Sequence, residues 1–254
     1  MAVTTAPCEL LGWDSDLFGF PVARVRGQGL DRDSAAAVDA WCAEAGVRCL
    51  YLLLDAGDLA SAEVAAGHGF REVDRRATFR RSMEGAAQLS VGGPAGMEIR
   101  DAEEPELDRL MALAGRSHRS SRFYSDGGFP VERCDALYRA WVERGFSDPE
   151  WGLLAALVDG EPAGYMVHSG VVDGEGHGEL GAVDARYRGQ GIGRALHVAM
   201  FHVLMERGSR THRGILSAAN RPIVRLHERL GFSLDATEVW HHKWYETGGG
   251  RRWR

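Results

Sequence analysis

The hydrophobic and polar positions along the chain follow two different periods. Short apolar runs between glycines, prolines and polar turns predict strands, and apolar residues spaced three and four apart predict helices. The expected strands are Pro21–Val25, Cys49–Leu54, Glu72–Arg80, Met97–Arg100, Gly152–Val158, Ala163–Ser169, Leu180–Val183 and Ile215–Ala219, with one more starting at Phe232. The expected helices are Ser34–Ala45 with Ser34 as its N-cap, Asp58–Gly67, Pro105–Ala114, Asp135–Val142, one directly after Gly193 and one from Pro222 to Gly231. This mixture predicts an α/β (α+β) fold.

A segment rich in small residues divides this pattern in two. Residues 84–96 hold glycine, alanine, serine and proline with few large apolar side chains, which is typical of a linker. We expect an N-terminal domain over 1–84, a linker over 85–96, a second domain over 97–247 and a disordered tail over 248–254. A helix end, a Gly-Phe pair and a strand occur in both domains, at His68 and at Leu230. The first domain is therefore expected to be a truncated copy of the second.

The most informative segment joins a strand, a glycine-rich turn and a helix. The strand ends at Val183, the turn is Arg188–Gly193, and the helix follows at once. Glycines let a ligand approach the backbone N–H groups, and the helix N-terminus behind them carries partial positive charge. The segment predicts a pyrophosphate cradle, the alternative being a tight turn that binds nothing. A dinucleotide fingerprint is excluded because Arg194 stands at its last glycine, and a P-loop because no Gly-Lys-Ser/Thr follows.

A second motif covers residues 220–232. Asn220 follows a short apolar run, Pro222 stands at a helix start, and Gly231 ends the helix before Phe232. His227 falls on the apolar face of this helix. The motif therefore predicts a short helix between two strands, with Asn220 before it and His227 on its apolar face.

Together the two motifs resemble the acyl-CoA site of the GNAT N-acetyltransferase superfamily. The resemblance implies the GNAT fold, a mixed, mostly antiparallel twisted sheet flanked by helices, with acetyl-CoA as cosubstrate and no metal. The residues implied to hold acetyl-CoA are Ala182, Val183, Arg188, Gly189, Gln190, Gly191, Ile192, Gly193, Arg194 and Asn220. Asn220 is equally suited to cap its helix, and Arg194 to a solvated position, so these alternatives stay open.

Two further segments narrow the resemblance. Residues 11–21 and 121–130 are similar to segments of two-domain GNAT enzymes that acetylate nucleotide-linked amino sugars, of the TDP-fucosamine acetyltransferase type. This implies transfer of an acetyl group to the amine of an amino-deoxysugar linked to a nucleoside diphosphate, most simply dTDP. The basic and aromatic stretch 116–124 suits such a substrate, and a solvated basic turn is the alternative. The candidate substrate contacts are Arg119, Arg122, Phe123, Tyr124 and His168.

Two residues are candidates for proton transfer. The superfamily usually has tyrosine at the position of His227, where it protonates the leaving thiolate, and imidazole can do the same. A hydrogen-bonded core histidine is the equal alternative. Glu179, the candidate base, shares a sheet face with Val183 unless a bulge intervenes, and an ordinary strand-start carboxylate is its alternative. A backbone N–H near Ala182 or Val183 is expected to bind the oxyanion.

The composition of the chain narrows the classes of partner that we expect it to bind. The net charge of −6 argues against a broad nucleic-acid surface. No apolar run approaches the ~20 residues of a membrane helix, and the first ten residues lack a signal-peptide pattern. The four cysteines show no metal-ligand spacing, which favours reduced thiols in a cytoplasmic protein. We expect a small-molecule partner without nucleic acid or membrane, and exposed aromatic residues on the last strand are compatible with a homodimer.

Two rival functions stay open at this point. One is acyl transfer to a different amine, on an antibiotic, a polyamine or a protein N-terminus. The other is a non-catalytic CoA-binding sensor that kept the cradle and lost the chemistry when His227 replaced tyrosine.

Overall fold

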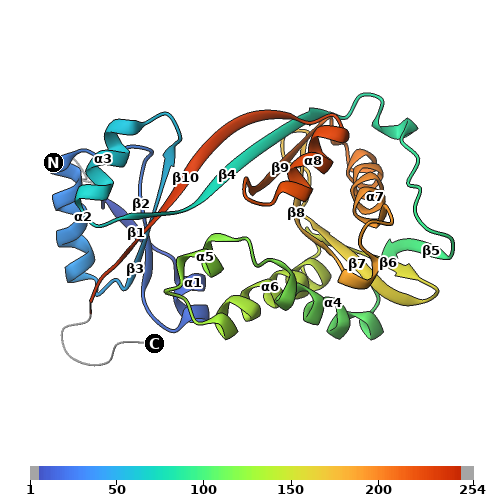
Figure 1. The fold of residues 1–254 in the computed structure, drawn as a ribbon, viewed down its shortest axis with the longest axis horizontal. Coiled ribbons are helices and arrows are strands. Elements are labelled where there is room, and N and C mark those ends of the chain that lie inside the picture. Colours follow the sequence, from blue (N-terminus) through green and yellow to red (C-terminus); the bar gives the residue numbers. More distant parts are fainter. Residues whose placement is uncertain (1–5, 247–254) are drawn as a thin grey trace. The chain divides into compact units, whose positions relative to one another are not determined.

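The computed structural model describes residues 6–246, which form two compact units (Figure 1). Unit 1 holds residues 6–76, 121–133 and 237–246, and unit 2 holds residues 77–120 and 134–236. The units therefore differ from the predicted domains. The predicted linker 85–96 lies inside unit 2, and two later segments return to unit 1. The tail predicted over 248–254 lies outside the described residues.

Unit 1 is built on strands in the order β1-β2-β3-β10. The strands are β1 (Cys8–Leu10), β2 (Val22–Val25), β3 (Cys49–Asp55) and the C-terminal part of β10 (Ser233–Trp244). The helices are α1 (Gly12–Phe18), α2 (Arg32–Glu44), α3 (Leu59–Gly67) and α5 (Arg122–Asp126). β2 runs parallel to β3, whereas β1 and β10 pair antiparallel with β2 and β3.

The two faces of the unit 1 sheet carry different side chains. Leu50, Leu52 and Leu54 of β3 join an aliphatic core that includes residues of α2 and α3. Tyr51 points the other way because side chains alternate along a strand. Its ring stacks on His242 of β10 with centroids 4.6 Å apart. This second face is consequently aromatic and polar, and α5 packs against it.

Unit 2 contains strands in the order β4-β9-β8-β7-β6-β5. The strands are β4 (Arg71–Ser82, from 77 on), β5 (Met97–Asp101), β6 (Gly152–Val158), β7 (Glu161–His168), β8 (Glu175–Val183) and β9 (Thr211–Ser217). The helices are η1 (Ala86–Gln88), α4 (Glu104–Ser117), α6 (Val131–Ser147), η2 (Ala185–Tyr187), α7 (Ile192–Glu206) and α8 (Arg221–Arg229). β5 through β8 pair antiparallel, and β8 with β9 parallel.

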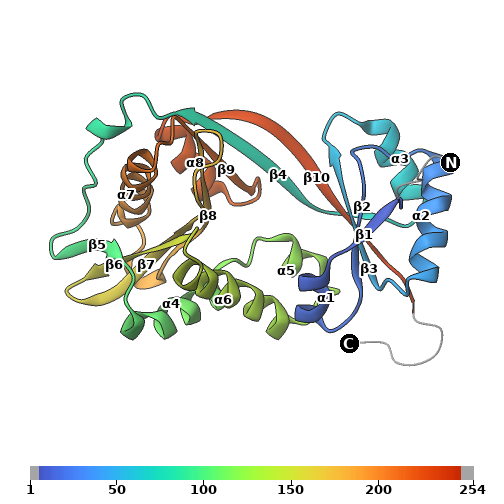
Figure 2. The ribbon, with the colours of Figure 1, turned by 180° about the vertical axis from the view of Figure 1, so that it is seen from behind.

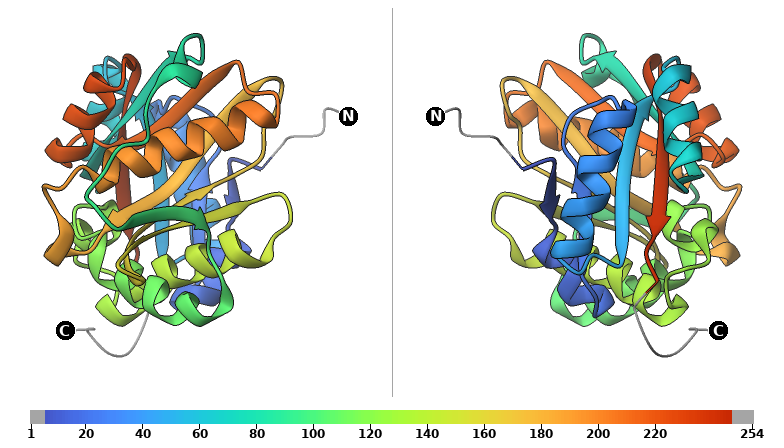
Figure 3. Two further views of the ribbon diagram at one scale, coloured as in Figure 1. Left: turned by 90° about the vertical axis from the view of Figure 1, so that its right-hand side faces the viewer. Right: turned by 90° about the vertical axis from the view of Figure 1, so that its left-hand side faces the viewer.

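Helices cover both faces of the unit 2 sheet, with α7 on one face and α4 and α6 on the other (Figures 2 and 3). The alternation along β7 agrees with these layers. A β-carbon on Gly164 would lie 3.2 Å from Leu196 of α7, while the Tyr165 hydroxyl lies 2.7 Å from His118 at the end of α4. The predicted mostly antiparallel sheet flanked by helices is confirmed.

β8 and β9 separate part of the way along their length. They pair only from Glu175 to Gly178 of β8, against residues 211–214 of β9. β8 continues to Val183 with β7 alone as its neighbour. The β7–β8 register also shifts, because Val167 faces Leu180 and His168 faces Gly178, so Glu179 sits in a β-bulge. The open edge of β8 therefore begins directly after an irregularity in its pairing.

Strands β4 and β10 end in different units. Each follows a helix and a Gly-Phe pair, at Gly69 and at Gly231. β10, from the C-terminal half of the sequence, pairs with β3 of unit 1, while β4, from the N-terminal half, lies beside β9 of unit 2.

The start of α2 differs from the prediction. Asp31, not Ser34, is its N-cap, and the Asp31 carboxylate accepts a hydrogen bond from the Ser34 N–H at 2.8 Å. Ser34 returns the contact by accepting from the Asp31 N–H at 2.9 Å. The two residues form a capping box, which satisfies two donors rather than one. The short β1 and α1 were not anticipated, since three and seven residues give little periodicity.

Candidate active site

A cavity of about 430 Å³ lies in unit 2 where β8 and β9 separate. It has walls on both faces of the sheet, with Leu196 and Leu226 on the side of α7 and α8 and Tyr165 on the side of α4. The lining residues are Ser117, His118, Arg119, Ser120, Tyr165, Met166, Gly181, Ala182, Val183, Arg188, Gly193, Leu196, His197, Asn220, Pro222, Ile223 and Leu226. The cavity thus passes the open edge of β8 and connects the two helical layers.

The glycine-rich turn places the N-terminus of α7 at one side of this cavity. Gly189 and Gly191 have φ angles of +79° and +85°, and Gly191 is the N-cap of α7 without a side-chain cap. No atom lies within 4 Å of where a β-carbon on either residue would stand. The first-turn N–H groups of a helix have no partner within it, so they are open to an anion here.

Two predicted cofactor residues have side chains suited to a ligand in the cavity. Arg188 lines it, and its Nε donates to the Val183 carbonyl at 3.2 Å. Asn220 also lines it, and although it precedes α8 its side chain makes no capping hydrogen bond. The alternative of an N-capping role for Asn220 is therefore not realised, and its amide remains available to a ligand.

The other predicted cofactor residues take different positions. Ala182, Val183 and Gly193 line the cavity, whereas Gly189, Gln190 and Gly191 form the exposed turn beside it. The Ile192 side chain is buried in the apolar core of unit 2. Arg194 is neither in the cavity nor simply solvated, because its Nη1 donates to the Ser90 carbonyl at 2.8 Å and so holds the 85–96 segment.

The strand register distinguishes the two candidate oxyanion donors. The Asp184 N–H donates to the Ala163 carbonyl, and Gly164 faces Val183. Because backbone groups of an antiparallel pair alternate in direction, Ala182 directs its N–H toward Tyr165 of β7, and Val183 directs its N–H toward the open edge. Of the two, the Val183 N–H is the one that faces a ligand in the gap.

His227 lies in the core of unit 2 rather than on the cavity wall. Its Nδ1 donates to the Ile223 carbonyl at 3.0 Å, and its ring packs against Phe232 with centroids 4.5 Å apart. Burial lowers its pKa from 6.5 to about 4, so the ring is neutral at pH 7. The neutral ring carries its proton on Nδ1, which leaves Nε2 without a proton to donate. This is the core histidine that the sequence left as the alternative.

Glu179 and His168 also lie away from the cavity lining. The Glu179 carboxylate accepts a hydrogen bond from the Ser169 hydroxyl at 2.7 Å. The bulge at this residue removes the even spacing that related its side chain to Val183. His168 is fully buried, its Nδ1 lies 3.4 Å from the Ser169 carbonyl, and a β-carbon on Gly152 would lie 2.4 Å from its ring. The space around its ring is thus filled by protein.

The predicted substrate stretch is divided between the two units. Arg119 lines the cavity of unit 2 and pairs with Asp135 at 3.0 Å. Arg122 belongs to unit 1, where its guanidinium stacks at 4.1 Å on Tyr51 and at 4.2 Å on Trp240. Phe123 joins the same aromatic face, 5.6 Å from Phe18. Tyr124, in α5, also belongs to unit 1, so neither unit alone assembles the predicted contacts.

The structure adds two residues that sequence reasoning missed. His118 and Tyr165 both line the cavity, and His118 Nε2 lies 2.7 Å from the Tyr165 hydroxyl. His118 lies inside the basic and aromatic stretch 116–124, in which only arginines and aromatic residues were predicted to contact the substrate. Tyr165 carried no signal, because its partner is 47 positions away along the chain.

Asp184 fixes the start of the loop that leads to the cradle. Its carboxylate accepts hydrogen bonds from the backbone N–H of Arg186 at 3.0 Å and from Arg116 Nη2 at 2.8 Å. The hydrogen bonds to Arg186, followed by the one to Arg116, lower its pKa to about 2.

Asp184→Asn is expected to lower the free energy of unfolding by about 1–3 kcal/mol, because it removes the charge from buried hydrogen bonds. Since this loop carries Arg188, the affinity for acetyl-CoA, the ligand expected from the sequence, should fall severalfold as well. Urea unfolding and titration calorimetry measure the two effects. Asp173→Asn, in an exposed turn of unit 2, is the control. Unchanged stability would contradict the anchoring role.

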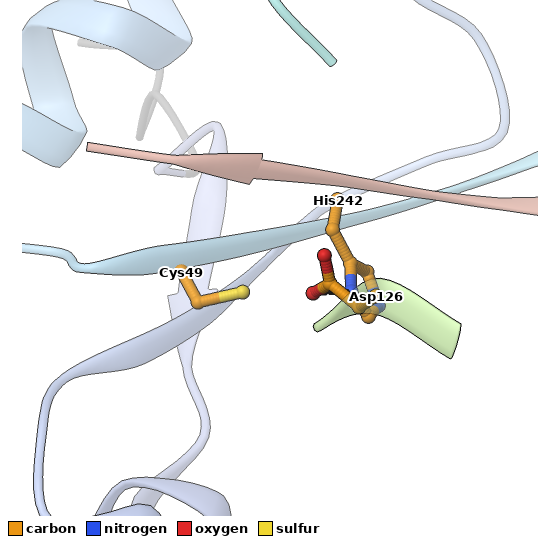
Figure 4. Close-up of side chains that lie close together, drawn as sticks. All are labelled: Cys49, Asp126 and His242. Carbon is orange, nitrogen blue, oxygen red and sulfur yellow. Dashed lines mark hydrogen bonds and ion pairs between the residues drawn. The ribbon is translucent and has the colours of Figure 1, made fainter. Parts of the chain in front are cut away.

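A separate cluster lies on the aromatic face of unit 1. Cys49, Asp126 and His242 bring a thiol, a carboxylate and an imidazole within 4.8 Å of one another (Figure 4). His242 Nδ1 donates to Asp126 Oδ2 at 2.7 Å, and its Nε2 accepts from Arg122 at 2.8 Å. Trp244 Nε1 also donates to Asp126 Oδ2, at 2.9 Å.

The charges around this cluster disfavour a metal ion. The guanidiniums of Arg122 and Arg71 stand beside His242 and Asp126, and a cation there would meet two fixed positive charges. Burial raises the pKa of Cys49, which disfavours the thiolate that a metal needs. The hydrogen bonds of the cluster instead hold α5 on the sheet. All four cysteines are buried and none forms a disulfide within residues 6–246. No helix in this range has the length and hydropathy of a membrane span.

Comparison with known proteins gives the following similarities. The model of the acetyltransferase (GNAT) family matches residues 109–232, which contain the cavity and the glycine-rich turn. Mycothiol acetyltransferase of Thermomonospora curvata is 30% identical over 184 residues, covering 72% of this chain and 60% of that protein. The spore coat polysaccharide biosynthesis protein SpsD of Bacillus subtilis is 23% identical over 155 residues, covering 59% of this chain and 52% of that protein.

The chain thus spans about 60% of the length of the mycothiol acetyltransferase that it matches. Among solved structures, a GCN5-related N-acetyltransferase from Kribbella flavida matches with a TM-score of 0.64 at 18% identity. The match covers 98% of this chain and 89% of that one. At this identity it shows a shared fold.

Proposed function

We propose that the protein transfers an acetyl group from acetyl-CoA to the primary amine of a small molecule, because the model of the acetyltransferase (GNAT) family matches residues 109–232, which contain the cavity. The observation that carries this proposal is the cavity at the point where β8 leaves β9. It opens toward both helical layers, so two reactants can meet at the edge of β8 without either passing through the other.

The side of the cavity toward α7 suits the acyl donor. Its glycine-rich turn and helix N-terminus match the charge of a pyrophosphate, and Arg188 adds a cation beside them. Asn220 supplies an amide for the pantetheine arm. With the thioester lying in the gap beside β8, the Val183 N–H donates to its carbonyl oxygen as negative charge develops there. Acetyl-CoA is the donor that this arrangement favours.

The side toward α4 is left for the acceptor amine. It is lined by Ser117, His118, Arg119, Ser120 and Tyr165, which together offer hydroxyls, an imidazole and a guanidinium. Holding the amine against the thioester supplies much of the acceleration in direct transfer, because two reactants become one bound pair. The neutral amine attacks, loses a proton, and the C–S bond breaks.

For the acceptor, we favour an amino-deoxysugar carried by a nucleoside diphosphate, such as a dTDP-sugar. The similarity of residues 11–21 and 121–130 to enzymes of that type supports it, as does the likeness to SpsD of Bacillus subtilis. Arg119, which lines the cavity on the acceptor side, is the candidate cation for a diphosphate, although Asp135 already pairs with it.

A second acceptor class is favoured by a separate observation. Mycothiol acetyltransferases reach 30% and 35% identity to this chain, well above the 23% of SpsD. Such an acceptor would be an unacetylated form of mycothiol, and it would not need a cationic site for a diphosphate. The pairing of Arg119 with Asp135 and of Arg116 with Asp184 is consistent with that less charged acceptor.

The test is acetyl-CoA-dependent release of free thiol with a panel of amines. The panel holds dTDP-linked amino sugars, the same sugars unlinked, unacetylated mycothiol, aminoglycosides and polyamines. Turnover confined to nucleotide-linked sugars supports the first acceptor, and turnover confined to the mycothiol form supports the second. Binding of acetyl-CoA by calorimetry without turnover on any amine would contradict the proposed enzyme and favour a CoA sensor.

A further inference from the structure

His118 and Tyr165 occupy the acceptor side of the cavity in a fixed arrangement. Tyr165 lies on β7 directly opposite Ala182, and its side chain is fully buried apart from the cavity that it lines. His118 ends α4, and its ring stacks on Tyr138 of α6 with centroids 4.6 Å apart and planes 24° apart. Three elements therefore hold one hydroxyl and one imidazole 2.7 Å apart at the cavity wall.

The cavity offers few other groups that can accept a proton. None of its described lining residues is aspartate or glutamate. Its second histidine, His197, lies on α7 and donates from Nδ1 to the Gly193 carbonyl at 2.7 Å, on the donor side. Burial lowers the pKa of His118 to about 4, which keeps its imidazole neutral and able to accept at pH 7.

Resting on the proposed acetyl transfer, we propose that Tyr165 and His118 form its proton relay, in which the Tyr165 hydroxyl contacts the attacking amine and His118 Nε2 receives the proton. The Tyr165 O–H donates to Nε2, and the oxygen lone pair faces the cavity to accept from the substrate N–H. This assignment moves the acid–base role from His227 and Glu179, which do not line the cavity, to a pair that does.

The proposed reaction conserves its protons and electron pairs. The amine lone pair forms the C–N bond to the thioester carbonyl carbon, and the carbonyl electrons move to oxygen. A proton passes from the now cationic nitrogen to Tyr165 while Tyr165 passes its own to His118. The C–S bond then breaks, its electron pair leaves with sulfur, and the imidazolium returns the proton through Tyr165 to the thiolate. The products are the amide and free CoA, with both residues restored.

The relay is tested by Tyr165→Phe and His118→Gln, with His177→Gln as the matched control. His177 lies on β8 outside the cavity lining, with its ring near Arg213 and Glu175. Removal of a general acid–base group costs about 10²–10⁴-fold in rate. We expect kcat to fall at least 100-fold in both relay variants, with the Kd of acetyl-CoA within twofold of the unaltered protein. Retention of more than a third of kcat in His118→Gln would overturn the relay.

A second readout is independent of any acceptor. In protein labelled with ¹⁵N-histidine, the Nε2 resonance of His118 reports whether that nitrogen accepts a hydrogen bond. We expect it to move between the unaltered protein and Tyr165→Phe at pH 7, and to stay fixed in His177→Gln. An unmoved resonance overturns the relay even if no amine is turned over. A moved resonance with acetyl-CoA bound and every amine inert upholds the contact and instead contradicts the proposed function.

Discussion

Gly191→Val is expected to weaken acetyl-CoA binding at least tenfold. Gly191 is the N-cap of α7 at φ +85°, a conformation that a β-branched residue adopts only with strain. The valine side chain would also stand beside the N–H groups that are to approach the pyrophosphate. Strain in the left-handed region costs about 1–2 kcal/mol, so some loss of stability accompanies the loss of affinity. Titration calorimetry with acetyl-CoA measures the effect.

The other end of the same helix provides the control. Gly208 follows α7 at φ +91°, and, as at Gly191, no atom lies within 4 Å of where its β-carbon would stand. Gly208→Val therefore introduces the same backbone strain at a position that does not approach the cavity. Both variants should lose similar stability in urea, while Gly208→Val keeps the affinity for acetyl-CoA. Equal loss of affinity in the two variants would show that strain alone, and not the cradle, is responsible.

Acid is expected to unfold the protein well above pH 4. Burial is the main cause that lowers the pKa of His118, His227 and His242 to about 4, against 6.5 for an exposed histidine. Between these two values the unfolded chain binds protons that the folded chain does not. Stability is therefore complete above pH 6.5 and is lost as the pH falls toward 4. A shift of one pKa unit corresponds to about 1.4 kcal/mol. Each of the three histidines therefore contributes on the order of 3 kcal/mol to the free energy of unfolding above pH 6.5.

Urea unfolding at pH 7.5, 6.5, 5.5 and 4.5 measures this dependence. His227→Leu removes one of the three groups and should make the dependence shallower, whatever it does to stability at pH 7.5. His177→Gln, at a partly buried histidine, is the comparison. A free energy of unfolding that stays constant from pH 7.5 to 4.5 would contradict the burial of these rings.

The elements of the fold were largely predictable because their signals are local. The apolar runs 152–158 and 163–169 predicted two strands, which form the antiparallel pair β6 and β7. Asp159 and Gly160 between them both have positive φ, at 50° and 80°. The placement of β4 and β10 was not predictable, because strand order depends on contacts between distant parts of the chain. The bounds of the two units were not predictable for the same reason, since composition marks the 85–96 segment but does not indicate where its neighbours pack.

In the candidate site, too, only the features with a local sequence signal were predictable. The glycine-rich turn was recognisable because a few adjacent residues indicate both the positive φ angles and the start of the helix. The role expected of His227 rested on its alignment with a tyrosine, but an imidazole is shorter than a phenol, and here it packs on Phe232 inside the core. The bulge at Glu179 left no mark in the sequence. The contact between His118 and Tyr165 depends on two elements meeting in space, which no local pattern encodes.

The positions of β4 and β10 amount to an exchange of last strands between the two halves of the sequence. Each half ends in a helix, a Gly-Phe pair and a strand, and each gives that strand to the sheet of the other half. A single cut in the 85–96 segment would therefore release no folded half. Either fragment would leave behind a strand that its partner needs and expose an unpaired sheet edge of its own. The half with the cavity therefore depends on β4, a strand from the N-terminal half of the sequence, to complete its sheet.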